Sequence, residues 1–330
     1  MSRILVTGGA GYIGSICAAE FIRQGHRVTI LDDLSTGFRD AVPAEADFSP
    51  LRLQDHAAIA ALCARRNFDG VYHFAGKALI PESIVNPGVF FDCNLAAGIR
   101  FLETLRHQGV RRFIFSSTAA VYGDPQTLPM PETHPVAPLN AYGESKLAFE
   151  RVLAWYARAY GWNVTIFRYF SAAGATAEHG ERHQPETHVI PLLLSAAAGE
   201  IPAFTLYGRD YPTPDGYCWR DFIHVRDLAR AHAMVWAQDR PGCEIYNLGS
   251  GIMYSLQQLC STVQSVSGRN FSVRIGSRRP GDPARLCADP AKFMRAFSWQ
   301  PRDSELETII RDAWHWKLSA ARFGPAGVAA

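Results

Sequence analysis

A strand that runs into a glycine-rich turn and then a helix, within residues 3–14, constrains this chain more than any other feature. The segment reads Arg3-Ile-Leu-Val-Thr-Gly-Gly-Ala-Gly-Tyr-Ile-Gly14, an apolar run, a turn and the start of a helical apolar pattern. Gly9, Gly11 and Gly14 fit the spacing G-x-G-x-x-G, and with Gly8 in place of Gly9 they fit its wider variant. The missing side chains leave backbone N–H groups at the helix start open to a pyrophosphate.

A second strand supports a dinucleotide as the ligand of this turn. Residues 27–31 form an apolar β-branched run that ends at Asp32, about twenty residues beyond the turn. A carboxylate at that place accepts hydrogen bonds from both ribose hydroxyls and repels a 2′-phosphate. The sequence therefore predicts an NAD-binding unit and disfavours NADP.

Strands and helices alternate through the first half of the chain. The predicted strands cover 4–7, 27–31, 48–53, 71–75, 112–116 and 164–168. The predicted helices cover 55–66, two patterns around Pro87 that reach His107, and 142–160. This alternation predicts an α/β fold with a doubly wound, Rossmann-like parallel sheet.

The character of the sequence changes after Ser171. Loops lengthen, prolines cluster, and short strands at 203–206, 244–248 and 272–275 lie among short helices. We predict a cofactor-binding domain over 1–171 and a smaller mixed α/β substrate lobe over 172–330, with some chain returning to the sheet. The final helix, 304–318, is expected to pack back, and the tail after Arg322 to be disordered.

Composition excludes several classes of function. The formal net charge is +2 over 330 residues, so electrostatics favour neither nucleic acid nor an anionic membrane as a partner. Seven scattered cysteines without a C-x-x-C pair indicate neither disulfides nor zinc, and no metal site is expected. Met1 leads directly into the first strand, so a signal peptide is not expected and we predict a cytoplasmic protein.

Tyr142 and Lys146 are four residues apart, one turn apart on one helix face. A tyrosine is a poor base at its ordinary pKa of about 10, but a neighbouring ammonium and a nicotinamide cation stabilise the phenolate. Ser116 and Thr118 stand at the end of a strand, where a doubly wound sheet opens its ligand crevice. Tyr142 and Lys146 could instead be a solvated helix pair with no catalytic role. The dinucleotide-binding glycine turn upstream favours a role in proton transfer.

Ordered motifs along the chain resemble the extended short-chain dehydrogenase/reductase family. In the first domain they are Gly8-Gly-Ala-Gly-Tyr-Ile-Gly14, Leu31-Asp-Asp-Leu-Ser35, His73-Phe-Ala-Gly76, Ser116-Ser-Thr-Ala-Ala-Val-Tyr-Gly123 and Tyr142-x-x-x-Lys146. In the second lobe Arg168-Tyr-Phe170, Tyr211-Pro-Thr-Pro-Asp-Gly216, Arg220-Asp-Phe-Ile-His-Val225, Tyr246-Asn-Leu-Gly249 and Arg278-Arg-Pro-Gly-Asp282 resemble its UDP-glucose 4-epimerase group. The resemblance runs from Arg3 to about Lys317.

The resemblance implies NAD-dependent epimerisation at C4 of a UDP-hexose, UDP-galactose to UDP-glucose. Hydride leaves C4 while Tyr142 takes the hydroxyl proton, the 4-keto sugar rotates, and hydride returns to its other face. The implied catalytic residues are Thr118, Tyr142 and Lys146. The implied cofactor contacts are Gly8, Gly11, Tyr12, Ile13, Gly14, Asp32, Leu34, Ser35, Asp55, Phe74, Ala75, Gly76, Asn94, Ser116, Tyr142, Lys146 and Tyr169.

The same resemblance assigns the substrate side. Arg220 and Arg279 are expected on phosphate, Asp282 on a ribose hydroxyl, Tyr207 on uracil and His188 near the diphosphate. Thr118, Ser171 and Leu286 complete the implied substrate contacts. Ser171 stands where many members have Asn, and Ala78 where some have Lys, which puts substrate preference in question.

Leu286 matches a family position that is a bulky Tyr in enzymes restricted to unsubstituted hexoses. A leucine there predicts some turnover of UDP-N-acetylglucosamine. The helices at 83–107 and 142–160 resemble the pair that forms a four-helix dimer contact in the family. A homodimer is therefore expected, with Leu147, Phe149, Leu153 and Trp155 supplying apolar surface.

Three other functions remain open from the sequence. A 4,6-dehydratase would need an Asp-Glu pair straight after Thr118, where this chain has Ala119 and Ala120. A UDP-pentose or UDP-glucuronate 4-epimerase shares the mechanism and differs only in its sugar contacts. A non-catalytic NAD-binding regulator is disfavoured by the intact set of Thr118, Tyr142 and Lys146.

Overall fold

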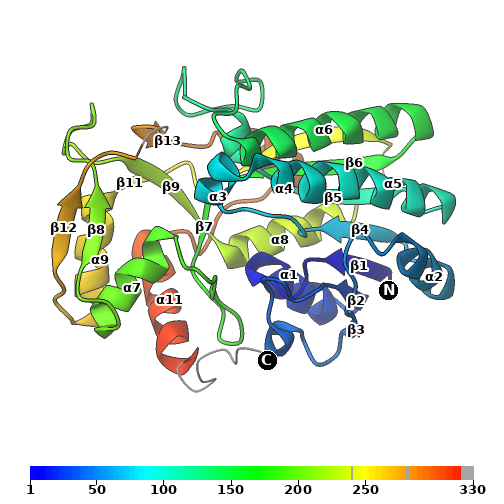
Figure 1. Ribbon diagram of the computed structural model, residues 1–330, viewed down its shortest axis with the longest axis horizontal. Coiled ribbons are helices and arrows are strands. Elements are labelled where there is room, and N and C mark those ends of the chain that lie inside the picture. Colours follow the sequence, from blue (N-terminus) through cyan, green and yellow to red (C-terminus); the bar gives the residue numbers. More distant parts are fainter. Residues whose placement is uncertain (239–240, 280–281, 321–330) are drawn as a thin grey trace.

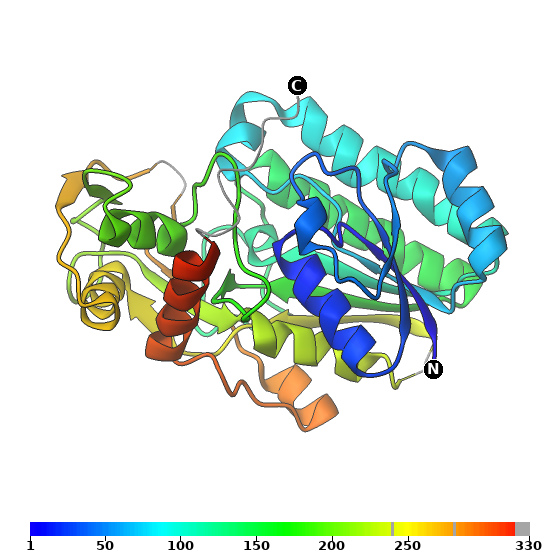
Figure 2. The ribbon, with the colours of Figure 1, turned by 90° about the horizontal axis from the view of Figure 1, so that it is seen from below.

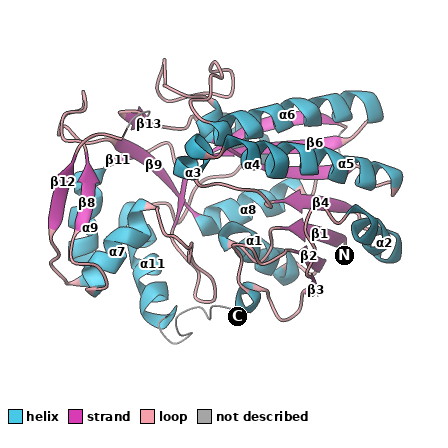
Figure 3. Cartoon of the chain, in the orientation of Figure 1, coloured by secondary structure: helices cyan, strands magenta, loops and turns pink. Residues whose placement is uncertain are grey.

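A parallel sheet with helices on both faces forms the larger part of the molecule, and a smaller lobe lies beside it (Figures 1 and 3). The structure is a computed structural model, and it describes residues 1–238, 241–279 and 282–320. Within these ranges the sheet has seven strands in the order β10-β6-β5-β4-β1-β2-β3. Their bounds are β1 Arg3–Thr7, β2 Arg27–Leu31, β3 Asp47–Ser49, β4 Gly70–His73, β5 Arg112–Thr118, β6 Asn163–Tyr169 and β10 Gly242–Leu248. The predicted fold class is confirmed.

The helices cover the sheet in two layers. One face packs against α1 (Tyr12–Arg23), α8 (Val225–Val235) and α10 (Ala291–Phe297), and the other against α2 (His56–Arg66), α5 (Ala97–His107) and α6 (Ala141–Tyr160). Strand side chains alternate between these cores: Ile4 and Val6 enter the first, and Leu5 enters the second. No described helix combines the length and apolar character needed to cross a membrane.

The helical stretch before α5 is broken into short pieces, where two long patterns were predicted. It comprises α3 (Ile80–Val85), α4 (Pro87–Phe91) and a π-helical turn, Asp92–Ala96, that leads into α5. Pro87 occupies the first turn of α4, the position where a missing N–H is tolerated, so one helix ends and another begins. The π turn carries Asn94, whose side chain hydrogen-bonds to Lys77 and Ser145, and such turns are frequent at functional sites.

The helix faces correct the expected dimer surface. Phe149 and Leu153, four residues apart, are buried against the sheet, and Leu147 is buried in the separate cluster at the start of α6. Trp155 is exposed on the same helix, and α3, which packs against α6, exposes Ile84.

The smaller lobe contains a two-stranded and a four-stranded sheet among the described residues. In the first, β8 (Phe204–Tyr207) pairs with β12 (Val273–Gly276). In the second, β9 (Trp219–His224) pairs with β7 (Ser171–Ala173), β11 (Met253–Ser255) and β13 (Arg285–Leu286). The last four strands were not predicted, since each is short or carries polar side chains.

Two predictions about the second half are corrected. The final helix, α11 (Leu306–Ala320), packs with α7 (Val189–Ala198) and α9 (Leu256–Ser267) inside the lobe, and Figure 2 shows it there beside α7. The predicted strand at 244–248 is β10, which lies at the edge of the large sheet beside β6 rather than in the lobe. The chain that returns to the sheet is thus β10 with α8 and α10. The tail after Arg322 lies outside the described residues.

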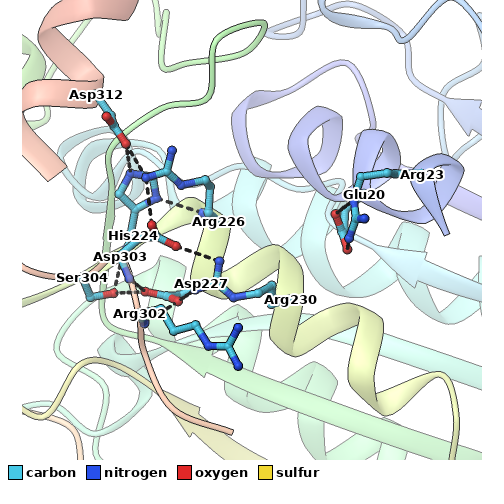
Figure 4. A network of polar contacts seen from close by, with 10 residues as sticks. All are labelled: Glu20, Arg23, His224, Arg226, Asp227, Arg230, Arg302, Asp303, Ser304 and Asp312. Carbon is cyan, nitrogen blue, oxygen red and sulfur yellow. Dashed lines mark hydrogen bonds and ion pairs between the residues drawn. The ribbon is translucent and has the colours of Figure 1, made fainter. Parts of the chain in front are cut away.

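A buried polar network joins the sheet to the lobe (Figure 4). Asp227 at the start of α8 accepts hydrogen bonds from the backbone N–H of Asp303, at 2.9 Å, and from the Ser304 hydroxyl, at 2.6 Å. His224, just before α8, contacts Asp312 of α11 at 3.2 Å. Because Asp227 is fully buried, its backbone and hydroxyl partners fix α8 against the loop before α11.

Candidate active site

The glycine turn after β1 is held so tightly that side chains would not fit. Gly8 has φ +70, and a Cβ there would lie 2.5 Å from the Ala75 backbone N. A Cβ on Gly14 would lie 2.2 Å from the Gly8 carbonyl O. Gly11 is the N-cap of α1 and has no side chain to cap it, so the first N–H groups of the helix remain available to a phosphate. Ile13 lies in that first turn, partly buried against the core.

Asp32, at the end of β2, is fixed beside this turn. Its carboxylate accepts hydrogen bonds from the backbone N of Ala10 at 3.0 Å and of Leu34 at 2.9 Å. Burial raises the pKa of Asp32, and these two hydrogen bonds oppose the rise. Leu34 adopts φ +59, a conformation unusual for leucine, and its N–H donates to Asp32 in this turn.

Two other predicted adenosine contacts sit in short loops near the same sheet edge. Ser35 donates its backbone N–H to Asp33 at 2.9 Å. Asp55 is the N-cap residue of α2, and its carboxylate accepts the backbone N–H of Arg52 at 2.8 Å. Local turns therefore hold the Ser35 backbone and the Asp55 carboxylate.

The segment after β4 lies directly against the glycine turn. The backbone N–H groups of Phe74 and Ala75 both donate to the Thr7 carbonyl, at 3.0 and 3.1 Å. A Cβ on Gly76 would approach the Asn94 Oδ1 to 2.9 Å. Phe74 packs against the ring of His232, with centroids 5.2 Å apart, so it is partly a core residue.

Asn94 connects this segment to α6 through hydrogen bonds. Its side chain accepts the Lys77 N–H at 2.8 Å and donates to the Lys77 carbonyl at 3.0 Å and to the Ser145 hydroxyl at 3.1 Å. Lys77, beside the Ala78 departure, extends its ammonium to Glu82 at 3.2 Å. Asn94 thus holds the backbone of Lys77 in place. It also lies on the segment where the nicotinamide end of the cofactor is expected.

Four predicted residues, Ser116, Thr118, Tyr142 and Lys146, meet at the carboxyl end of β5 and the start of α6. Thr118 lies beside the Tyr142 phenol and favours its ionised form. Lys146, one turn later, donates from Nζ to the Ser116 carbonyl at 2.8 Å. The Asn140 side chain caps the helix by accepting the Gly143 N–H at 2.9 Å, which fixes where the helix begins and hence where Tyr142 stands.

Burial dominates the electrostatics of this group. It raises the pKa of Tyr142, and the Thr118 side chain opposes the rise. It lowers the pKa of Lys146 to about 8, while the negative charge of Glu150 opposes the fall. The predicted stabilisation of the phenolate depends on the nicotinamide cation together with Lys146, so it stays a prediction for the cofactor-bound protein.

Tyr169, the last predicted residue at this end, is oriented by a histidine that sequence reasoning missed. Its hydroxyl lies 2.6 Å from His232 Nε2, and His232 Nδ1 lies 2.8 Å from the Leu228 carbonyl. Because Nδ1 donates to that carbonyl, Nε2 accepts and the tyrosine donates. Burial lowers the pKa of His232 to about 4, which keeps the ring neutral.

A buried ion pair between α6 and β6 was also not predicted from the sequence. Glu150 and Arg168 are 2.6 Å apart and only 3% and 5% exposed. The Ser117 hydroxyl donates to the same carboxylate at 2.5 Å. Glu150 follows Lys146 by four residues, and this spacing could have indicated it.

The predicted substrate residues converge in two neighbouring pairs. Arg220 contacts Asp282 at 2.8 Å, and the Arg279 guanidinium lies 4.1 Å over the Tyr207 ring. Leu286 pairs in register with Arg220. It packs against the small core cluster of Ala119, Val121, Tyr122, Met130, Leu147, Phe170 and Ala288. The residues between Arg279 and Asp282 lie outside the described part of the chain.

Ser171 and His188 stand at the two ends of a loop. Ser171 begins β7, opposite Phe222 of β9. His188 directs Nδ1 to Glu181 at 2.8 Å and Glu186 at 3.1 Å. The Tyr12 hydroxyl donates to the Gly174 carbonyl of this loop at 2.6 Å, so the first turn of α1 also holds the lobe.

Asp221, next to Arg220, is a positioning residue that the motif did not reveal. It accepts the N–H groups of Ser250 at 2.7 Å, Gly251 at 3.0 Å and Ala288 at 3.0 Å. Burial raises its pKa to about 6, and these hydrogen bonds oppose the rise. The carboxylate thereby joins the segment after β10 to the segment that follows β13.

This geometry is matched by known proteins. Residues 4–249 match the NAD dependent epimerase/dehydratase family. The chain belongs to this family. A UDP-glucose 4-epimerase of Corynebacterium glutamicum is 41% identical over 313 residues, covering 94% of each chain.

Solved structures agree with the family assignment. The UDP-glucose 4-epimerase of Stenotrophomonas maltophila, with bound NAD and formylated UDP-arabinopyranose, has a TM-score of 0.94 at 34% identity and covers 98% of this chain and 100% of that one. The Brucella ovis enzyme, in complex with NAD, has a TM-score of 0.92 at 39% identity and covers 96% of this chain and 98% of that one. The resemblance seen in the motifs is confirmed.

NAD is the cofactor of this family, as the sequence predicted. The residues present fit it, because the uncapped start of α1 offers N–H groups to a pyrophosphate and Asp32 is held ready for ribose hydroxyls.

Proposed function

We propose that this chain is a UDP-glucose 4-epimerase, which interconverts UDP-galactose and UDP-glucose. The observation that supports this proposal most is the grouping of Thr118, Tyr142 and Lys146 at the sheet edge where the glycine turn opens. A proton-transfer set next to a dinucleotide site is what reversible oxidation of a secondary alcohol requires.

The residues of the chain control protons while the bound cofactor carries the electrons. NAD, when bound, supplies an acceptor and then a donor of hydride for C4 of the sugar. Tyr142 takes the proton of the 4-hydroxyl as the carbonyl forms and returns it when the carbonyl is reduced. Thr118, beside the phenol, favours its ionised form, and Lys146, fixed on the Ser116 carbonyl, adds positive charge.

The substrate lobe would hold the nucleotide firmly and the sugar loosely. Arg220 and Arg279 supply positive charge for the diphosphate, and Tyr207 offers a ring face to uracil. Asp282 would accept a ribose hydroxyl, and His188 keeps Nε2 for a phosphate oxygen because its Nδ1 faces carboxylates. A sugar held through its diphosphate can then present either face of C4.

The test is incubation of the purified protein with UDP-galactose without added cofactor, followed by chromatography for UDP-glucose. Tyr142→Phe should lower kcat by about 10²–10⁴-fold, the usual contribution of general acid–base catalysis. The matched control is Tyr160→Phe on the same helix, whose side chain is exposed at the far end. A Tyr142→Phe variant as active as the parent would favour a binding role instead.

Two other activities are distinguished by the same assay. A 4,6-dehydratase would consume UDP-glucose without forming UDP-galactose, and Ala119 and Ala120 leave it without the acid and base for elimination. A UDP-pentose or UDP-glucuronate 4-epimerase would turn over those sugars and leave UDP-galactose unchanged.

The proposal extends to UDP-N-acetylglucosamine as a second substrate. Leu286 is only partly buried, and its side chain is smaller than the tyrosine ring of the restricted enzymes. Leu286→Tyr should abolish turnover of UDP-N-acetylglucosamine and retain that of UDP-galactose. Absence of the N-acetyl activity in the parent, beside robust turnover of UDP-galactose, would contradict this extension.

We also propose a homodimer that functions in the cytoplasm. The exposed apolar side chains of Ile84 and Val85 on α3 and Trp155 on α6 support a contact through these helices. Trp155→Glu should then shift the mass measured by light scattering from dimer to monomer. All seven cysteines are free thiols, which supports a reducing compartment.

A further inference from the structure

The loop between β7 and α7 gathers four metal-ligating side chains outside the catalytic group. They are Glu181, His183, Glu186 and His188, in the spacing E-x-H-x-x-E-x-H. One ligand atom from each lies within 4.8 Å of all the others. Two imidazoles and two carboxylates drawn from eight consecutive residues therefore converge on one small volume.

The contacts within this group outnumber the protons that could make them. His188 Nδ1 lies 2.8 Å from Glu181 Oε1 and 3.1 Å from Glu186 Oε1, and His183 Nδ1 lies 3.0 Å from the same Glu181 oxygen. Each Nδ1 carries at most one proton, so two protons serve three close contacts. Both carboxylates thus approach one nitrogen, and a cation bound among these groups would satisfy all three contacts.

We propose that Glu181, His183, Glu186 and His188 form a binding site for a divalent cation of the zinc type. Four nitrogen and oxygen ligands suit tetrahedral Zn²⁺, whose bonds of about 2.0–2.2 Å place neighbouring ligand atoms roughly 3.4 Å apart. Three of the contacts are slightly shorter than this, and all four ligand atoms lie within 4.8 Å of one another, so small shifts of the side chains admit the ion. Cysteine spacing, on which the expectation of no metal rested, gives no information about a site of this kind.

The surroundings hold the ligands in place. Glu186 Oε1 accepts the backbone N–H groups of Thr187 at 2.7 Å and His188 at 2.8 Å, which orients its carboxylate. The Glu181 side chain is only 10% exposed, so few waters compete for it. Coordination through Nδ1 leaves Nε2 of His188 facing outward.

The site lies where it would fasten the lobe to the cofactor domain. Arg182, between two ligands, pairs with Asp40 at 2.5 Å, and its guanidinium lies 4.2 Å over Phe38, both in the segment after β2. On the other side Gly180 approaches Trp316 of α11 so closely that a Cβ would lie 2.1 Å from the indole. A bound cation would therefore pin a loop that bridges the two parts beside the glycine turn.

Metal content tests this inference without any turnover assay, so it stands apart from the proposed function. Untagged protein is stripped with a chelator, dialysed against Zn²⁺ and then metal-free buffer, and analysed by mass spectrometry of the metal. We expect one equivalent of zinc per chain and a tetrahedral absorption spectrum with Co²⁺. Zinc should also raise the Tm, because an ion that binds only the folded state stabilises it.

Matched variants locate the site. His183→Ala and Glu181→Gln should each weaken zinc binding by more than about 100-fold, since even outer-shell partners change metal affinity 10–100-fold. His107→Ala is the control, because His107 is an exposed histidine near a carboxylate, Glu103, on α5. Should His183→Ala fold poorly, the conservative Glu181→Gln variant carries the test. Failure of the parent to retain zinc, equal binding by all variants, or a thiolate-to-cobalt charge-transfer band would overturn the proposal.

Discussion

The cofactor side and the substrate side of the candidate site differ in the groups that form them. The cofactor side consists of backbone: a turn in which Gly8 and Gly14 leave no room for a Cβ, and Asp32 held by two N–H groups. The substrate side consists of long side chains that contact one another, Arg220 with Asp282 and Arg279 with Tyr207. The first side is rigid before any ligand arrives, whereas the second must exchange its internal contacts for ligand contacts.

This difference suits the proposed reaction. The cofactor must stay in place through two hydride transfers, so a preorganised backbone cradle is favourable. The sugar must turn between them, so contacts confined to the nucleotide and diphosphate are sufficient. Substitutions should therefore act on the cofactor side through loss of fit, and on the substrate side through graded loss of affinity.

The largest effect is expected from Gly14→Ala. A Cβ there would lie 2.2 Å from the Gly8 carbonyl, which is backbone and cannot move without opening the turn. We expect loss of copurifying NAD and of activity, by more than about 100-fold, since misplacement by 1 Å can cost that much. Gly88→Ala is the control, because a Cβ on this helical glycine meets nothing within 4 Å. Equal NAD content in both variants would show that the cradle is not rigid.

A second prediction concerns Glu150, which lies behind the rigid side. Glu150→Gln leaves Arg168 buried without its charged partner and should lower the free energy of unfolding by about 3–5 kcal/mol. It also removes the negative charge that raises the pKa of Lys146. The lysine then loses its proton at lower pH, so the alkaline fall of kcat should begin at lower pH.

Denaturant unfolding and a pH profile of kcat measure these two effects separately. The double variant Glu150→Met with Arg168→Met removes both buried charges, so it should regain much of the stability and keep the shifted pH profile. Glu144→Gln on the same helix is the control. An unshifted profile in the double variant would show that Glu150 acts only structurally.

The cofactor side is formed by local sequence patterns and the substrate side by distant residues, and this difference explains what the sequence could predict. β2 was predicted with its observed bounds, 27–31, and α6 within one residue, because glycines, β-branched runs and helical spacing are local. The Arg220 and Asp282 pair joins positions 62 residues apart, and β10 reaches the sheet from within the lobe sequence. His232 and Asp221 are likewise defined by partners distant in sequence, so no local pattern reveals their roles.

The smallest effect is expected on the substrate side, from Arg220→Lys. Lysine keeps the charge but loses the planar fork that lets Arg220 contact Asp282 at 2.8 Å and the Pro283 carbonyl at 2.9 Å. Losing one hydrogen bond to a charged group costs about 1.5 kcal/mol at the low end of its range, so KM for UDP-galactose should rise about 10-fold, with kcat nearly unchanged. Arg274→Lys, on exposed β12 of the same lobe, should leave both constants as they are. A fall in kcat as large as the rise in KM would mean that Arg220 orients the sugar itself, and the substrate side would then be as preorganised as the cofactor side.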